Sequence, residues 1–257
     1  MAGNNAINNQ SFSYNGMPLW GVNFVRLQGS VSTSPSATIY TVPSGKKAVG
    51  YQFMYRNTSG GSRTISTRYI ISGNNYDTST IIATSNNASL GEGINTNSSL
   101  TYPGAMVMNA GESFTILGAT AASVQYFITM LEFDDNVPWY SARNLNINAS
   151  PFTLYTVPTG KKALIGVQTY MGSGTAWSGS NTSQKSIYFV DNGNVLNANN
   201  LVYFFTTPAV TTNCLSSTSN GNQNCMAVLS SGDTIQVTQA TLTGTNWMFC
   251  NVYEVNN

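Results

Sequence analysis

The residues that could do acid–base or metal chemistry are few in this chain. It has 257 residues, nine of them acidic, and no histidine. Histidine is the commonest general base and metal ligand near neutral pH, so only carboxylates are left for such roles. The one adjacent acidic pair is Asp134-Asp135, which we interpret as a solvated hinge. A Ca²⁺ site and a catalytic role are the alternatives, but Ca²⁺ needs about six or more oxygen ligands and no acidic calcium-loop pattern supplies them.

Two further acids occupy matching places in two similar segments, Glu132 and Glu254. Duplication of a segment explains this match without a function. A glycosidase with two facing carboxylates is the enzymatic alternative, and no sequence feature supports it. We therefore predict that the chain is not an enzyme and that it has no catalytic, cofactor-binding or metal-binding residues.

The three cysteines do not have the spacing of a zinc site. Cys214 and Cys225 bracket a loop rich in Ser, Asn and Gly, where they could form a local disulfide or stay as free thiols. Cys250 lies in a strongly apolar segment and is predicted to be a small core residue.

Two pairs of lysines and a few aromatic residues are candidates for an interaction surface. Lys46-Lys47 and Lys161-Lys162 are four of the ten cations. They either flank a turn, with their stems over apolar surface, or dock against acidic groups of a neighbouring subunit. Aromatic residues that precede a predicted strand or lie in a loop could anchor an interface, pack locally or bind a sugar; these are Trp20, Trp139, Tyr140 and Trp177.

The elements that position these residues come from a repeated block. The sequence from Tyr40 to Ala48 returns almost unchanged from Tyr155 to Ala163. A separation of about 115 residues is too long for a solenoid repeat and suits a whole small domain. Within each copy, β-branched and aromatic residues favour a strand, Pro ends it, and Ser/Thr-Gly turns the chain into a second strand. We therefore predict a β-hairpin in each copy.

Later segments repeat as well. Gly111-Glu112 and Gly232-Asp233 each precede a strand, and each copy closes with a strand of large residues, 124–133 and 247–255. Short apolar runs separated by Gly, Asn, Ser and Pro are typical of β-sandwiches and jelly rolls. The prediction is an all-β chain of two tandem duplicated antiparallel β-sandwich domains that resemble jelly rolls. Residues 1–16 form a polar N-terminal arm, residues 17–135 the first sandwich and residues 136–257 the second.

Composition narrows the class of protein. Only 7% of the residues are charged, against about 25% in an average soluble domain. The surface must therefore be polar but weakly charged, which suits an extracellular or particle-bound protein better than a cytosolic enzyme. A net charge of +1 without a basic cluster argues against a nucleic-acid partner. We expect no signal peptide and no membrane span, because neither pattern occurs.

At Tyr40–Lys47 and Tyr155–Lys162 the chain resembles β-sandwich modules of tailed-bacteriophage virion proteins. Those modules open with a Thr-Val-Pro-small-Gly-Lys hairpin and carry a Gly-acid turn near their end, as at Gly111-Glu112 and Gly232-Asp233. The resemblance implies a non-enzymatic subunit that coats the head or belongs to the tail, often as a trimer.

From this resemblance we expect a structural virion protein, foremost a capsid decoration (cement) protein on the particle surface, made in the host cytoplasm. Its partners would be other virion proteins, such as the major capsid protein or tail proteins, and further copies of itself. The alternative is a tail or fibre-associated protein that binds a receptor or glycan. The absence of long fibrous repeats favours the head.

Overall fold

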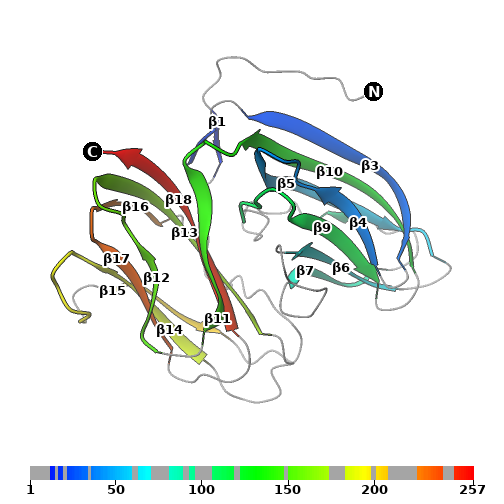
Figure 1. The fold of residues 1–257 in the computed structure, drawn as a ribbon. Coiled ribbons are helices and arrows are strands. Elements are labelled where there is room, and N and C mark those ends of the chain that lie inside the picture. Colours follow the sequence, from blue (N-terminus) through cyan, green and yellow to red (C-terminus); the bar gives the residue numbers. More distant parts are fainter. Residues whose placement is uncertain are drawn as a thin grey trace. The chain divides into compact units, whose positions relative to one another are not determined.

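The structure is a computed structural model that consists of strands wherever it describes secondary structure (Figure 1). It describes residues 12–14, 17–19, 22–33, 36–59, 63–70, 81–88, 93–95, 106–118, 122–147, 150–173, 183–197, 201–207, 225–239 and 246–257. The predicted all-β fold class is confirmed. Within these ranges no helix is long and apolar enough to cross a membrane.

The chain divides into two compact units, and the boundary between them along the sequence lies between Val137 and Pro138. The sequence placed this boundary two residues earlier, between residues 135 and 136. We call residues 18–137 unit 1 and residues 138–257 unit 2. Part of the predicted arm forms a strand, because β1 (Phe12–Tyr14) pairs with β2 (Met17–Leu19) in a two-stranded sheet. Residues 1–11 lie outside the described ranges.

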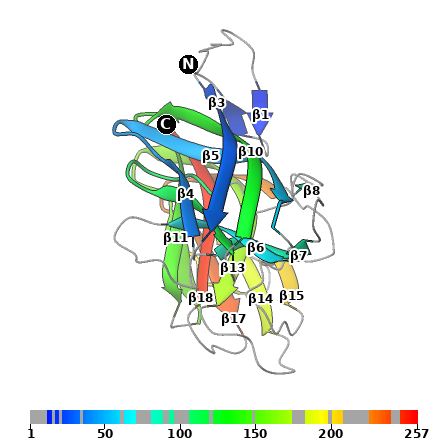
Figure 2. The same cartoon turned by 90° about the vertical axis from the view of Figure 1, so that its right-hand side faces the viewer.

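Unit 1 is built from two four-stranded antiparallel sheets (Figure 2). The strand order is β3-β10-β5-β8 in one sheet and β4-β9-β6-β7 in the other. The strands are β3 (Asn23–Thr33), β4 (Ser36–Thr41), β5 (Lys46–Asn57), β6 (Arg63–Ile70), β7 (Ile81–Ala88), β8 (Gly93–Asn95), β9 (Ser113–Gly118) and β10 (Ala122–Asp134).

Unit 2 has the same topology strand for strand. Its sheets have the orders β11-β18-β13-β16 and β12-β17-β14-β15, and two such sheets of four strands make a jelly roll. Identical topology is what duplication of one ancestral unit predicts; the common origin stays a prediction. The strands are β11 (Trp139–Ile147), β12 (Phe152–Thr156), β13 (Lys161–Ser173), β14 (Ser183–Val190), β15 (Leu201–Thr207), β16 (Cys225–Ser230), β17 (Thr234–Gln239) and β18 (Asn246–Asn256).

The repeated block is not a hairpin of paired strands, which corrects the prediction. β4 and β5 belong to different sheets, as do β12 and β13, so the turn carries the chain from one sheet to the other. Pro43 ends β4, and the amide of Lys46 donates to the Pro43 carbonyl at 3.2 Å. Gly45 has a φ of 72°, which glycine adopts without strain. The turn at Pro158 repeats this geometry, with a 3.1 Å bond from Lys161.

A bulge also recurs at one position of the repeat. The register of β4 against β9 shifts between Thr38 and Tyr40, and that of β12 against β17 shifts between Thr153 and Tyr155. Successive residues of a regular strand point to opposite faces, whereas a bulge re-aims a side chain. The consequence is visible in unit 2, where the consecutive residues Leu154 and Tyr155 both belong to the core.

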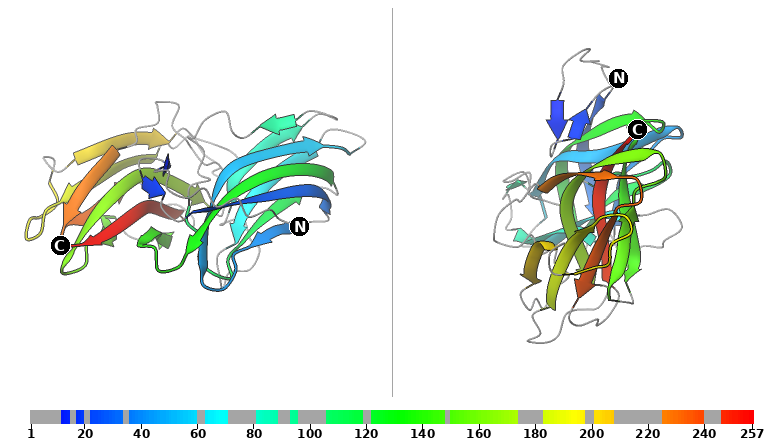
Figure 3. Two further views of the ribbon diagram at one scale, coloured as in Figure 1. Left: turned by 90° about the horizontal axis from the view of Figure 1, so that it is seen from above. Right: turned by 90° about the vertical axis from the view of Figure 1, so that its left-hand side faces the viewer.

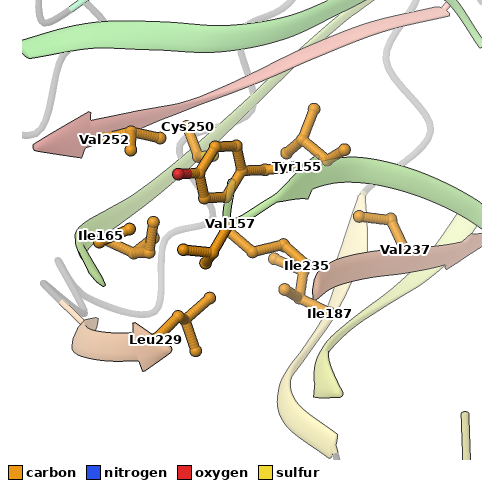
Figure 4. Packing of buried hydrophobic residues seen from close by; sticks show 11 residues of the cluster. Tyr155, Val157, Ile165, Ile187, Leu229, Ile235, Val237, Cys250 and Val252 are labelled. Atoms are coloured by element: carbon orange, nitrogen blue, oxygen red, sulfur yellow. The ribbon is translucent and has the colours of Figure 1, made fainter. Parts of the chain in front are cut away.

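The core of each unit lies between its two sheets, which can be followed in Figure 3. In unit 2 apolar side chains from both sheets point toward one another (Figure 4). Strands β12, β14 and β17 contribute from one sheet, and β13, β16 and β18 from the other. The members are Leu154, Tyr155, Val157, Ala163, Ile165, Ile187, Leu229, Ile235, Val237, Cys250 and Val252.

Candidate functional site

In each unit, the Gly-acid turn forms backbone hydrogen bonds with the residue just before the turn that carries the chain from one sheet to the other, which we call the sheet-crossing turn. The amide of Val42 donates to the carbonyl of Glu112, and the amide of Gly111 donates to the carbonyl of Val42, both at 2.9 Å. Val157 makes the same two bonds with Asp233 and Gly232, at 2.9 and 3.0 Å. The two repeated sequence motifs are therefore in contact in each unit, and their backbones pair.

The acidic side chains of these turns accept backbone hydrogen bonds. Glu112 is 3% exposed and accepts from the amide of Asn109 at 2.8 Å. Asp233 is 9% exposed and accepts from the amides of Ser230 at 2.7 Å and Asn192 at 2.9 Å. A buried carboxylate needs such donors, so both acids have a structural role in their turns.

Glu132 and Glu254 each receive a tyrosine hydroxyl from the opposite sheet. Tyr40 donates to Glu132 Oε2 at 2.8 Å, and Tyr155 donates to Glu254 Oε1 at 2.8 Å. Tyr140 also donates to Glu254 Oε1, at 2.6 Å. Burial, and then the hydrogen bond to the glutamate, raises the pKa of Tyr40 and of Tyr155 well above the ordinary value. The Tyr40–Glu132 and Tyr155–Glu254 bonds connect the two sheets of each unit, whereas Tyr140 lies in the same sheet as Glu254.

The two glutamates lie in separate units, each bonded to its own tyrosines. The structure therefore gives each of them a structural partner. Among the described residues, no group of three or more Cys, Asp or Glu side chains is arranged to hold a metal ion.

Three of the four candidate lysines bond within their own unit. Lys46 Nζ forms a 2.6 Å ion pair with Asp134, and that hydrogen bond raises the lysine pKa. Lys47 Nζ donates to the carbonyl of Val137 at 2.9 Å, and burial lowers its pKa. Lys161 Nζ donates to Asn256 Oδ1 at 2.5 Å. Lys162 is exposed.

The acidic pair Asp134-Asp135 contacts the turn between β4 and β5. Asp134 holds Lys46, and the amide of Asp135 donates to the carbonyl of Gly45 at 3.1 Å. Unit 2 repeats the backbone contact, because the amide of Asn257 donates to the carbonyl of Gly160 at 3.0 Å. The pair is exposed and lies just before the boundary between the units, as predicted for a solvated hinge, and it also binds the turn between β4 and β5.

Of the two candidate interface aromatics that the structure describes, Tyr140 packs against the core of unit 2, which corrects the prediction for that residue. Trp139 is 1% exposed. Tyr140 packs against the unit 2 core and meets the ring of Tyr155 edge-on, with centroids 6.4 Å apart. The sequence Val-Pro-Trp-Tyr was predicted to precede a strand, but β11 begins at Trp139, so Tyr140 points toward the core and Trp139 lies on the other face of the strand. Trp20 and Trp177 lie outside the described residues.

The cysteines are described only in part. Cys250 is a buried free thiol, as predicted, and burial raises its pKa to about 12. The proposed bond between Cys214 and Cys225 falls on Cys214, which lies outside the described residues, and on Cys225, of which only the backbone is described.

The sequence did not single out the exposed apolar residues of unit 2. Val228 is 70% exposed and Val255 is 46% exposed. Val228 lies in the continuous apolar run Met226–Leu229, and such a run is typical of a strand buried on both faces. Only the fold distinguishes its outward residue from its inward ones.

No family model and no curated protein matches the chain. Among solved structures it is similar to PNGase F, a glycosylasparaginase from Flavobacterium meningosepticum, with 12% identity over 91% of this chain and 99% of that chain, and a TM-score of 0.35. It is also similar to a chain of infectious bursal disease virus Gt strain, with 8% identity over 90% of this chain and 73% of that chain, and a TM-score of 0.19. At these TM-scores neither similarity bears on the function of the chain.

Proposed function

We propose that the chain is a structural subunit of a virus particle, part of its head shell, which acts through contacts between subunits. The observation that carries this proposal is the repetition of one jelly-roll topology in two units. Jelly rolls are a recurrent architecture of viral capsid proteins. The repeated acids and tyrosines, which are the residues best suited to chemistry, are used in the same structural bonds in each unit.

The composition supports the same proposal. A chain in which only 7% of the residues are charged, with a net charge of +1, can pack closely among neighbours with little electrostatic repulsion. The sequence resemblance favours a decoration protein of a tailed-phage head. The two-unit chain equally suits a subunit of the shell lattice, because a trimer would contain six jelly rolls and so fit a position of local sixfold symmetry.

The test is to locate the protein in purified particles. Heads and tails are separated, and the chain is quantified in each by mass spectrometry against the other virion proteins. We expect it in the head fraction, and its copy number separates a lattice subunit from a decoration protein. Its absence from particles would refute the proposal. Recovery in the tail fraction, together with binding on a glycan array, would instead support the receptor-binding alternative.

A further inference from the structure

The loop that follows β14 begins with a tight turn, Asp191-Asn192-Gly193-Asn194. The amide of Asn194 donates to the carbonyl of Asp191 at 3.0 Å and closes the turn. Gly193 has a φ of 82°, the left-handed conformation that some β-turns require at their third residue. All four residues are exposed. The turn therefore presents an Asn-Gly pair to water.

An Asn-Gly pair holds an electrophile and a latent nucleophile in adjacent residues. The electrophile is the side-chain carbon Cγ of Asn192, and the nucleophile is the backbone nitrogen of Gly193 once it has lost its proton. Attack closes a succinimide ring, and glycine hinders it least because no Cβ stands beside the nitrogen. Val195 follows Asn194, and its stiff, branched side chain hinders the same attack. Two asparagines of one turn therefore differ in the chemistry open to them.

The fold leaves both reacting groups of the Asn-Gly pair accessible. Among the described residues, neither the side-chain amide of Asn192 nor the backbone amide of Gly193 makes a hydrogen bond. A Cβ placed on Gly193 would meet nothing within 4 Å. Asn197 of the same loop differs, because its Nδ2 donates to the carbonyl of Val195 at 3.2 Å. Attack by Gly193 on Asn192 therefore breaks no hydrogen bond within this part of the chain.

We propose that Asn192 is a site of spontaneous deamidation and that the reaction weakens the Gly-acid turn of unit 2. The Gly193 nitrogen gives its proton to hydroxide and bonds to Asn192 Cγ. The bond from Cγ to Nδ2 breaks, and the side-chain nitrogen takes a proton from water and leaves as ammonia. Water then adds to one of the two ring carbonyls and opens the ring. Opening at Cγ leaves an aspartate, whereas opening at the main-chain carbonyl leaves an isoaspartate.

Both products place a new negative charge beside Asp233. The amide of Asn192 donates to Asp233 Oδ1 at 2.9 Å, and Asp233 is only 9% exposed. The Asn192 side chain lies over Gly232, since a Cβ on that glycine would be 2.5 Å from Asn192 Cγ. The charge is therefore created next to a buried carboxylate, and like charges at short range destabilise each other.

The isoaspartate product also lengthens the main chain by one methylene group. The hydrogen bond from Asn194 to Asp191 spans the lengthened segment, so the closure of the turn changes. Asp233 links this turn to the rest of unit 2, because its carboxylate accepts from the amide of Ser230 at 2.7 Å and its carbonyl accepts from the amide of Val157 at 2.9 Å. Modification of Asn192 thus acts through Asp233 on the sheet-crossing turn.

The first test measures the reaction itself in the full-length protein. The protein is incubated at neutral and at mildly alkaline pH, both folded and in guanidinium chloride, and its proteolytic peptides are followed by tandem mass spectrometry. We expect Asn192 to lose its amide at least about ten times faster than Asn194, because glycine lowers the barrier that valine raises. The rate at Asn192 should rise with pH, since hydroxide removes the glycine proton, and it should be similar in the folded and unfolded chain.

Two results of this test would overturn the proposed site. One is an equal rate at Asn192 and Asn194. The other is an Asn192 that keeps its amide in the folded protein while it reacts in guanidinium chloride, which would show that the turn protects it.

The second test measures the effect of the modification on stability. Asn192→Asp reproduces the charge of one product, and Asn194→Asp is the matched control, because it puts the same charge in the same turn without the backbone bond to Asp233. We expect Asn192→Asp to lower the urea midpoint of unfolding and Asn194→Asp to lower it less. Aged protein enriched in isoaspartate by ion exchange should have a midpoint below that of the fresh protein. Equal midpoints for the two variants would refute the link to Asp233.

Discussion

The hydroxyl of Tyr40 or Tyr155 meets the same kind of partner in each unit, a glutamate on the last strand. The recurrent bulge just before the tyrosine aims its side chain inward. The two sites differ in one respect, because Glu254 accepts from both Tyr155 and Tyr140. At the position equivalent to Tyr140, unit 1 has Val25, which cannot donate.

Replacing Tyr40 by Phe is therefore expected to destabilise the protein more than replacing Tyr155 by Phe. Glu132 loses its tyrosine donor in the first variant, whereas Glu254 keeps Tyr140 in the second. An acceptor left unsatisfied in a partly buried position costs about 1–3 kcal/mol, and loss of one of two bonds costs about 1 kcal/mol. Urea denaturation of the two variants measures both values. Equal losses, or a larger loss for Tyr155→Phe, would contradict the assignment.

The same tyrosines make stability depend on alkaline pH. Burial raises the pKa of Tyr40 and Tyr155 in the folded protein above the ordinary value of 10.0. The folded state then binds more protons than the unfolded state above this pH, so stability is complete below about pH 10 and falls as the pH rises further. Melting temperatures between pH 8 and pH 11 should show this fall. A double Tyr→Phe variant should show a shallower one, and an identical slope would argue against these residues as its source.

At the scale of elements, the Gly-acid turn and the sheet-crossing turn behave as one structural piece. Gly111 and Gly232 have φ angles of 83° and 86°, a left-handed backbone conformation that residues with a β-carbon rarely adopt. A Cβ on Gly111 would meet nothing within 4 Å, whereas a Cβ on Gly232 would lie 2.5 Å from Asn192.

These two turns provide a matched pair of substitutions. Gly111→Ala is expected to cost about 1–2 kcal/mol, which is the backbone penalty of a left-handed conformation. Gly232→Ala should cost more, because the Asn192 side chain must also move. Denaturant midpoints of both variants compare the two losses of stability. A loss for Gly232→Ala no larger than that for Gly111→Ala would contradict the prediction and show that the Asn192 side chain moves without an energetic cost.

Local patterns in the sequence predicted the strands but not the sheets to which they belong. Pro43 and Gly45 correctly marked the end of one strand and a turn, yet the same residues serve a hairpin or a crossing between sheets equally well. The choice depends on the partner of Val42, which is the distant Gly111-Glu112 turn. The candidate surfaces were harder to predict, because the exposure of Val228 and the burial of Trp139 depend on the packing of whole sheets.

At the scale of the whole molecule, the low charge density determines how assembly should respond to salt. Only 7% of the residues are charged, and the apolar residues Val228 and Val255 are exposed on one sheet of unit 2. Screening weakens contacts between exposed charges and leaves apolar burial intact. We expect self-association to persist when NaCl is raised from about 0.05 M to 0.5 M, a range over which screening becomes strong. Dissociation at high salt, followed by sedimentation, would show that charge pairs dominate the contact.

The buried thiol of Cys250 gives unit 2 an intrinsic reporter of its own opening. Only the thiolate is a nucleophile, and a pKa of about 12 leaves very little thiolate at neutral pH. Iodoacetamide should therefore modify Cys250 only when the surrounding strands separate. Pulse alkylation in increasing urea, with the modified peptide quantified by mass spectrometry, would give the opening free energy of the C-terminal jelly roll alone, even inside an assembled particle where optical probes average over every subunit.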